Sequence, residues 1–187
     1  MSARSLFASL VVAFLVIGGS ASADSKKIEK EKSNPAFAGR IMLSDKYYPR
    51  SAKSLAAFNA QVRKQSKENF LEDKEKKNWK IYFAGFLKTP LNDVEYLVKI
   101  YEMTGRGQTL VATVEQFTDS RGQYSLLSSV VLDRKLAGVN KQLLMVLEAK
   151  GKTLASARFK ILGEGDRYSG KVNFSEDDAN GGSKEEE

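Results

Sequence analysis

The sequence predicts a mainly β protein, an antiparallel sandwich of about seven strands with an amphipathic helix on its amino-terminal side. Two patterns support this prediction. Apolar residues alternate with other residues in short segments spaced at about ten residues, which is typical of antiparallel sandwiches. The connections between these segments are rich in Gly, Asn and Asp, which tight turns favour. The composition, 42% hydrophobic and 28% charged, is ordinary for one globular domain.

The clearest of these segments predict a β-hairpin over residues 141–162. The first arm, Leu143–Ala149, is apolar on both faces for most of its length, as expected of a central strand. The second arm, Ala155–Ile161, alternates apolar and polar residues, so one of its faces is expected to be in water. Lys150–Lys152 supplies the short glycine turn between them.

Five further segments complete the predicted sheets. The candidate strands, hairpin arms included, are Trp79–Leu87, Val94–Met103, Thr109–Thr118, Tyr124–Asp133, Gln142–Lys150, Thr153–Leu162 and Gly170–Phe174. This pattern resembles the immunoglobulin or fibronectin fold without the Cys pair. The resemblance is one of architecture and implies no function. The predicted core, in residues 78–174, consists of Trp79, Ile81, Phe83, Tyr96, Val98, Ile100, Leu110, Val114, Met145, Leu147, Phe159 and Val172.

Residues 1–23 have the three parts of a secretory signal peptide. They are a short basic start with Arg4, the apolar run Leu6–Ile17 and a small-residue end. We expect cleavage before Asp24, since the apolar run is short of the roughly 18–20 residues of a membrane span. The chain has no Cys, which excludes disulfides and a lipid-modified Cys after the leader. The sequence therefore predicts an exported protein, periplasmic or extracellular, that is not a lipoprotein.

The charge is distributed unevenly along the chain. The formal net charge is +7; residues 24–80 carry 15 Lys/Arg against 8 Asp/Glu, whereas residues 175–187 carry 1 against 6. We expect residues 24–36 to be a disordered charged linker and residues 175–187 a disordered acidic tail, because both are poor in apolar residues. A basic bias can serve binding to anionic polymers or surfaces, although a solvated face is its commoner cause.

Residues 37–77 predict an extended arm followed by an amphipathic helix. The helix is expected over Ser51–Asn69, a range without Gly or Pro, with its first residue as N-cap. At 100° per residue, Leu55, Phe58 and Val62 fall on one narrow side, and the basic residues fall on the opposite side. The helix is therefore expected to have an apolar seam and a basic back.

This basic back, together with the aromatic turn before the helix, forms a candidate binding surface. The candidate residues are Lys46, Tyr47, Tyr48, Arg50, Lys53, Arg63, Lys64 and Lys67. Interleaved aromatic and basic residues stack on sugars or bases and neutralise phosphates, and basic amphipathic helices lie on membrane surfaces. The alternative is that the apolar seam covers the sandwich while the cations keep the outside soluble. We favour this alternative, because three apolar residues make a thin membrane-binding face.

Most enzyme chemistries find no support in the sequence. The chain has neither His nor Cys, which removes Ser-His-Asp centres, Cys-His centres and zinc sites built on those residues. Glu164 and Asp166 share a glycine-rich loop that fixes no separation between them, so they do not predict a glycosidase pair. Two Ser-Lys pairs sit among charged residues, where a lysine keeps its proton. They are Ser51 with Lys53 and Ser169 with Lys171.

Glu176–Glu187 approaches the spacing of a calcium-binding loop. Acids or Asn occupy positions one, three and five, Gly occupies six and Glu occupies twelve. However, Glu176 stands where Asp is usual, Ser183 stands where an apolar residue is usual, and Val172–Phe174 before the loop is predicted as a strand. An acidic tail explains the same residues, so we expect no metal and no cofactor.

The sequence thus predicts a non-enzymatic module for protein–protein interaction or envelope assembly, whose partner is another envelope or extracellular protein. The alternative is a binder of anionic envelope glycan or lipid through the basic helix, which clustered cations beside Tyr47 and Tyr48 would favour. A carboxylate-dependent hydrolase is a second and weaker alternative. No nucleic-acid partner is expected for an exported chain, and the sequence does not predict the oligomeric state.

Overall fold

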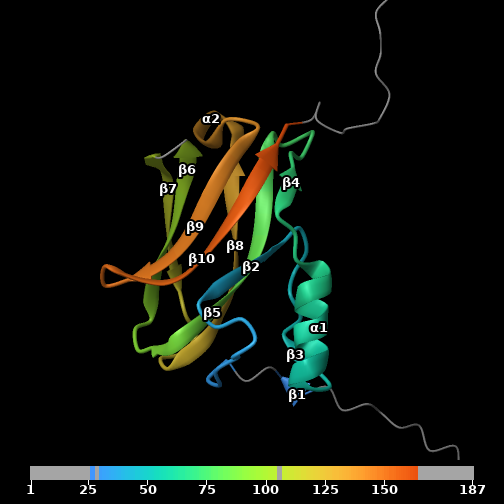
Figure 1. The fold of residues 1–187 in the computed structure, drawn as a ribbon, viewed down its shortest axis with the longest axis vertical. Coiled ribbons are helices and arrows are strands. Elements are labelled where there is room, and N and C mark those ends of the chain that lie inside the picture. Colours follow the sequence, from blue (N-terminus) through green and yellow to red (C-terminus); the bar gives the residue numbers. More distant parts are fainter. Residues whose placement is uncertain (1–25, 28–29, 105–106, 164–187) are drawn as a thin grey trace, which may run out of the picture.

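The computed structural model describes residues 26–27, 30–104 and 107–163, which form a mainly β structure with two short helices (Figure 1). The strands are β1 (Lys26–Lys27), β2 (Arg40–Ser44), β3 (Ser51–Ala52), β4 (Asn69–Leu71), β5 (Asn78–Leu91), β6 (Glu95–Thr104), β7 (Gly107–Phe117), β8 (Gln123–Asp133), β9 (Lys141–Ala149) and β10 (Lys152–Leu162). The helices are α1 (Leu55–Gln65) and α2 (Arg134–Ala137).

Several predictions fall on residues outside the described part of the chain. These are the signal peptide, the acidic tail with its calcium-loop pattern, the last candidate strand with Val172, the Glu164 and Asp166 pair, and the Ser169 and Lys171 pair. The structure describes the linker of residues 24–36 only at residues 26–27 and from residue 30 onward.

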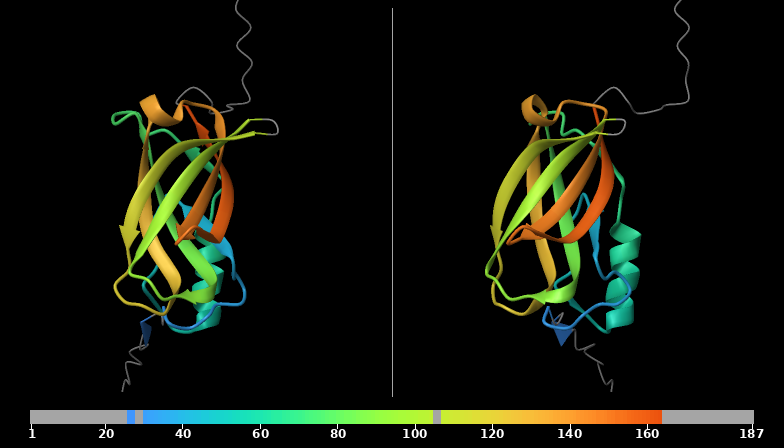
Figure 2. Two further views of the ribbon diagram at one scale, coloured as in Figure 1. Left: turned by 90° about the vertical axis from the view of Figure 1, so that its left-hand side faces the viewer. Right: turned by 60° about the vertical axis from the view of Figure 1, so that its left-hand side comes forward.

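Eight of the described strands form one mixed, curled sheet. Its order is β7-β6-β9-β10-β2-β5-β8, and β4 pairs with β10 beside this path. Neighbouring strands are antiparallel except where β10 runs parallel to β2 and to β4. Figure 2 shows the sheet curling around its interior. The mainly β prediction is confirmed. The immunoglobulin-like sandwich is not confirmed, because β10 links two antiparallel groups of strands into a single sheet through these short parallel contacts.

The predicted hairpin is confirmed as β9 and β10. Lys152 pairs with Ala149, so only Lys150 and Gly151 form the turn. Their φ angles, 49° and 74°, are both positive, as in the two-residue turns that match the twist of paired strands. β9 lies between β6 and β10, which is the central position its two apolar faces predicted.

The interior of the curl holds most of the predicted core. The predicted residues that are buried are Trp79, Ile81, Phe83, Tyr96, Val98, Ile100, Met145, Leu147 and Phe159. The prediction of Leu110 as a core residue is wrong, because this side chain is 51% exposed. Ile100 pairs with Ala112 whereas Tyr101 pairs with Leu110, so Val111 is an extra residue at a β-bulge. The bulge reverses the alternation, and Val111 packs against the core in place of Leu110.

The two groups of strands meet face to face across this core. A Cβ atom on Gly85 of β5 would lie 2.3 Å from Cδ1 of Leu147 on β9, although the two strands are not neighbours in the sheet. Glycine at this position therefore allows close approach of the two halves of the curled sheet. The absence of a side chain, rather than a special backbone conformation, is what this position requires.

The helix is shorter than predicted. Its N-cap is Ser54, whose side chain accepts a hydrogen bond of 3.1 Å from the backbone N–H of Ala57, so the prediction of Ser51 is wrong. Ser51 belongs to β3 and Asn69 belongs to β4. The helix ends because the following segment pairs with the sheet: the N–H of Lys67 donates to the carbonyl of Leu43 at 2.8 Å. Sheet hydrogen bonds thus replace the last predicted turns of the helix.

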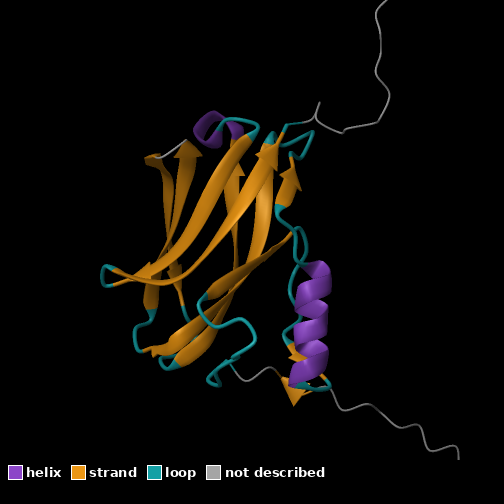
Figure 3. Ribbon diagram, viewed as in Figure 1, coloured by secondary structure: helices purple, strands orange, loops and turns teal. Residues whose placement is uncertain are grey.

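α1 covers part of the outer face of the sheet, beside β2 and β5 (Figure 3). Phe58 and Val62 are buried there against Phe86, and the Phe58 and Phe86 ring centroids are 6.2 Å apart. The prediction that Leu55 joins this seam is wrong, because it is 52% exposed. Phe37 and Tyr48 complete the buried cluster instead, so the segments before the helix supply apolar contacts that a helical wheel does not show.

Candidate functional site

A cavity of about 420 Å³ lies at the carboxyl-terminal end of α1. Residues 61, 64 and 65 form its helical wall, since positions three and four apart share one face of a helix. The end of β2 and the turn that follows form the opposite wall. The complete lining is Ser44, Asp45, Lys46, Gln61, Lys64, Gln65 and Lys67. Three of the predicted site residues, Lys46, Lys64 and Lys67, therefore come together here.

The charges around this cavity are unbalanced. Asp45 forms an ion pair with Lys67. Lys46 and Lys64 form no ion pair with any acid in the described part of the chain, so the cavity keeps two uncompensated cations. The N–H of Lys46 donates to the Ser44 hydroxyl at 3.0 Å, which fixes the backbone of the turn that carries one of them. The cavity is thus suited to a ligand with negative charge.

A pair of tyrosines in tilted ring contact lies beside this cavity. Tyr47 is 68% exposed, and its ring centroid is 4.1 Å from that of Tyr82 on β5. Tyr82 pairs in register with Ser44, a residue that lines the cavity. The ammonium of Lys80 lies 5.3 Å from the Tyr82 centroid and 6.0 Å from the Tyr47 centroid. A hydrogen bond with the Lys80 ammonium lowers the pKa of Tyr82, and the same bond raises the pKa of Lys80.

Lys80 and Tyr82 are site residues that the sequence did not reveal. Their separation by two positions placed them on one face of a predicted strand, which is a weak signal by itself. Only the pairing of β2 with β5 brings them next to the turn that carries Tyr47. That pairing joins segments about 40 residues apart in the chain, and no local pattern specifies it.

Two of the predicted site residues stabilise the fold instead. Tyr48 is only 6% exposed, and its hydroxyl lies 3.1 Å from that of Ser66. Burial raises the pKa of Tyr48 to about 12. Arg63 places its guanidinium carbon 5.2 Å from the ring centroid of Phe37, in a cation–π contact over the buried cluster. Assigning Tyr48 to the binding surface was wrong, because its ring is part of the apolar layer beneath α1.

Arg50 and Lys53 are exposed, but they lie away from the cavity. They flank β3, just before the first residue of α1, whereas the cavity lies at the last turn of the helix. A helix of 11 residues is about 16 Å long. The structure therefore divides the eight predicted residues into four groups. Lys46, Lys64 and Lys67 line the cavity, and Tyr47 lies exposed beside it. Tyr48 and Arg63 stabilise the fold, and Arg50 and Lys53 are cations away from the cavity.

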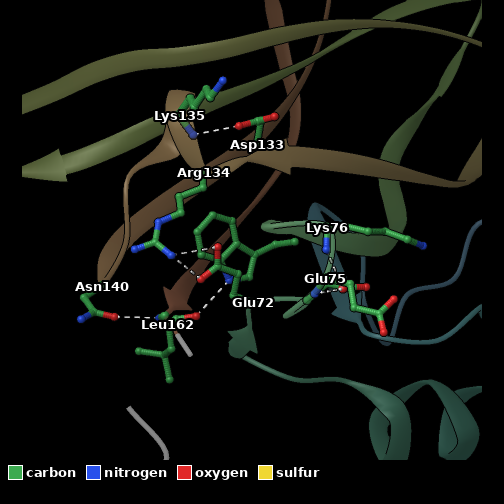
Figure 4. A network of polar contacts seen from close by, with 11 residues as sticks. Glu72, Glu75, Lys76, Asp133, Arg134, Lys135, Asn140 and Leu162 are labelled. Carbon is green, nitrogen blue, oxygen red and sulfur yellow. Dashed lines mark hydrogen bonds and ion pairs between the residues drawn. The ribbon is translucent and has the colours of Figure 1, made fainter. Parts of the chain in front are cut away.

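A second polar cluster, between the end of β4 and α2, has a structural role. The Glu72 carboxylate is buried and accepts hydrogen bonds of 3.2 and 3.4 Å from Arg134 (Figure 4). The Glu72 N–H and the Trp79 indole N–H both donate to the Leu162 carbonyl, at 3.0 and 3.1 Å. These bonds tie the start of α2 to the strands β5 and β10. A single carboxylate bound by arginine does not form the two-carboxylate arrangement that most glycoside hydrolases use.

Two further sets of reactive side chains among the described residues are exposed and lie away from the cavity. Repulsion from Glu115 raises the pKa of Glu95, but both carboxylates lie on the outer surface of β6 and β7 and neither lines the cavity above. Ser51 and Lys53 are both exposed, so Lys53 is not desolvated. Within the described ranges, no group of three acidic residues is placed to hold a metal ion.

Comparisons with known proteins do not assign this chain to a family. The sequence matches no family model, and a search of curated proteins gives no significant match. Among the described residues, no helix has the length and apolar character needed to cross a membrane.

Proposed function

We propose that this protein is an exported, non-enzymatic binding module that holds an acidic glycan of the cell envelope. The observation that carries the proposal is the convergence of Lys46 and Lys64, both without an acidic partner in the described chain, on a cavity beside Tyr47 and Tyr82. Export rests on the pattern of residues 1–23, and the intact mass of the mature protein checks it.

The shape and lining of the site suit a sugar acid. A volume of about 420 Å³ lies within the range of roughly 300–1,000 Å³ typical of small-ligand sites. Gln61 and Gln65 offer amide groups that bind hydroxyls. The Gln65 Oε1 atom is buried and accepts no hydrogen bond from the described residues, so it gains a partner if the amide turns toward a ligand hydroxyl. The exposed face of Tyr47 offers an apolar surface on which a sugar ring stacks.

A membrane surface fits the same region less well. An interfacial helix inserts its apolar side among the lipids, but Phe58 and Val62 of α1 are already buried against the sheet. Leu55 is the one large apolar side chain that α1 exposes to solvent. The cations alone do not distinguish lipid from glycan, whereas this burial and the neighbouring tyrosines favour glycan.

The test compares a double variant with a matched control. Lys46→Gln with Lys64→Gln removes both uncompensated cations, and we expect its affinity for short galacturonate oligomers to fall at least about tenfold. Lys135→Gln with Lys152→Gln, exposed cations away from the cavity, makes the same charge change and should bind like the wild type. Titration calorimetry on the full chain measures both. Equal affinities of the two double variants would contradict the proposal, as would a wild type that binds no acidic oligomer.

A second candidate function is pairing with another envelope protein along the edge of β7, where the Gln116 side chain also accepts a hydrogen bond of 2.7 Å from Ser128 of β8. This strand ends the sheet, exposes Leu110 and Phe117, and contains no Pro or Lys to discourage pairing. A partner strand could add to such an edge. A photo-crosslinker at Thr113, an exposed position of this strand, should then capture one partner in the envelope, and Leu110→Lys should abolish the capture. Capture that persists in the Leu110→Lys variant would rule out edge pairing.

A further inference from the structure

A larger groove, of about 800 Å³, lies next to the candidate cavity on the outer face of the sheet. It forms where β10 diverges from β2, because these strands pair only between Ser156 and Arg40. The segment of residues 66–68 lies between the two strands and forms one side of the groove. The Lys67 N–H donates a hydrogen bond to the Leu43 carbonyl of β2, and the Glu68 carbonyl accepts one of 2.7 Å from the Lys160 N–H of β10. The lining is Arg40, Ile41, Met42, Leu43, Ser66, Lys67, Glu68, Gln142, Leu144, Ser156, Ala157 and Arg158.

This groove is also basic. Arg40 and Arg158 are both exposed, and neither forms an ion pair with an acid in the described part of the chain. Glu68 is the one acid in the lining. Arginine presents a planar set of donors that binds a carboxylate through two parallel hydrogen bonds. The groove therefore offers two directional sites for acidic groups, in contrast to the point charges of Lys46 and Lys64 in the cavity.

The cavity and the groove are adjacent and share part of their lining. Lys67 lines both of them, and β2 passes from one to the other: Arg40–Leu43 line the groove, and Ser44 lines the cavity. Arg40 and Ser44 are four residues apart, a distance of about 13 Å at roughly 3.3 Å per residue. A single small anion does not span this distance, whereas a chain with repeated acidic groups does.

We propose that the cavity and the groove form one channel that binds a linear acidic polysaccharide. Successive acidic groups contact Lys46 and Lys64 at one end of the channel and Arg40 and Arg158 at the other. Lys67, held by Asp45, lies between the two sites. This inference rests on the proposed function and extends it by specifying a polymer, rather than a compact sugar acid, as the ligand.

The experiment measures how affinity depends on the length of the ligand. Galacturonate dimers, tetramers and octamers are titrated into the full chain at one fixed salt concentration. The affinity should rise with length until the oligomer spans both sites and should then level off. Arg40→Gln with Arg158→Gln should weaken octamer binding at least about tenfold and bring the octamer affinity close to that of the dimer. The Lys135→Gln with Lys152→Gln variant, of equal charge change, should bind the octamer like the wild type.

The outcomes separate this inference from the proposed function. If dimer and octamer bind with equal affinity, and the Lys46→Gln with Lys64→Gln variant loses that binding, the channel is overturned. The cavity then remains as a binding site. An octamer affinity unaffected by the arginine changes would also overturn the channel. Binding of no oligomer of any length would overturn both proposals. Tighter binding of a single-stranded polynucleotide of equal charge would overturn the choice of glycan, and weaker binding would support it.

Discussion

The inner and outer faces of β5 show two kinds of apolar packing. On the inner face, Trp79, Ile81 and Phe83 belong to a large core that eight of the ten strands contribute to or border. On the outer face, Ala84 and Phe86 belong to a small cluster made by α1, the arm before β2 and the turn after it. The inner core follows from strand alternation, whereas the outer cluster depends on contacts between segments with different local patterns.

The difference matters because the candidate site rests on the outer cluster. Tyr48 and Val62 are buried in that cluster. Tyr47, next to Tyr48, and Lys64, two residues after Val62, are exposed at or near the cavity. The inner core therefore decides whether the protein folds, while the outer cluster decides where the lysines and the tyrosine point. Substitutions in the two regions should have separable effects.

The largest effect should come from a charge in the inner core. Leu147 has no exposed surface, so Leu147→Asp buries an unpaired carboxylate at a cost of several kcal/mol against a total stability of about 5–15 kcal/mol. We expect this variant not to fold. Arg158→Asp, on the exposed face of the neighbouring strand, should shift the melting temperature only slightly. Circular dichroism melts measure both, and equal tolerance of the two changes would contradict the assignment of faces.

A smaller effect should come from the helix. Phe58 is 1% exposed, so Phe58→Ala should destabilise the protein by about 3–5 kcal/mol, or release α1 from the sheet if the outer cluster opens separately. Leu55→Ala is the matched control on the same helix, and its effect should stay below about 1 kcal/mol because Leu55 is half exposed. Urea unfolding followed by fluorescence and by hydrogen exchange at α1 distinguishes global from local loss. A larger effect of Leu55→Ala would show that the helix packs through its other side.

The smallest effect should be a pH dependence from Tyr48. Its pKa is raised to about 12 in the folded state, whereas the unfolded phenol titrates near 10. Between these values the unfolded state binds fewer protons than the folded state, so stability falls as pH rises from about 10 to 12. Tyr48→Phe removes this contribution, and Tyr47→Phe, at an exposed ring, should retain it. Urea midpoints of the three proteins from pH 9 to 12 test this; parallel curves for wild type and Tyr48→Phe would refute it.

The neighbours Tyr47 and Tyr48 show the limit of a sequence-based site prediction. The sequence predicts both on one binding surface, because aromatic and basic residues are interleaved there. The turn after β2 points Tyr47 toward solvent and Tyr82, and it points Tyr48 into the layer under α1. A turn has no fixed side-chain period, so its sequence does not determine which of two adjacent rings is buried.

The sequence by itself determined the elements whose signals are local. Strand alternation gave the β9–β10 hairpin and most of the inner core, because side chains in a strand alternate between faces at a fixed period. Only the tertiary structure decided the rest: the order of the strands in the sheet, the bulge that exposes Leu110, the early end of α1, and the meeting of Lys46, Lys64 and Tyr82. Each depends on hydrogen bonds or packing between segments that are distant in the chain. The free energy of these contacts outweighs the local conformational preference, and the contacts produce no periodic pattern in the sequence.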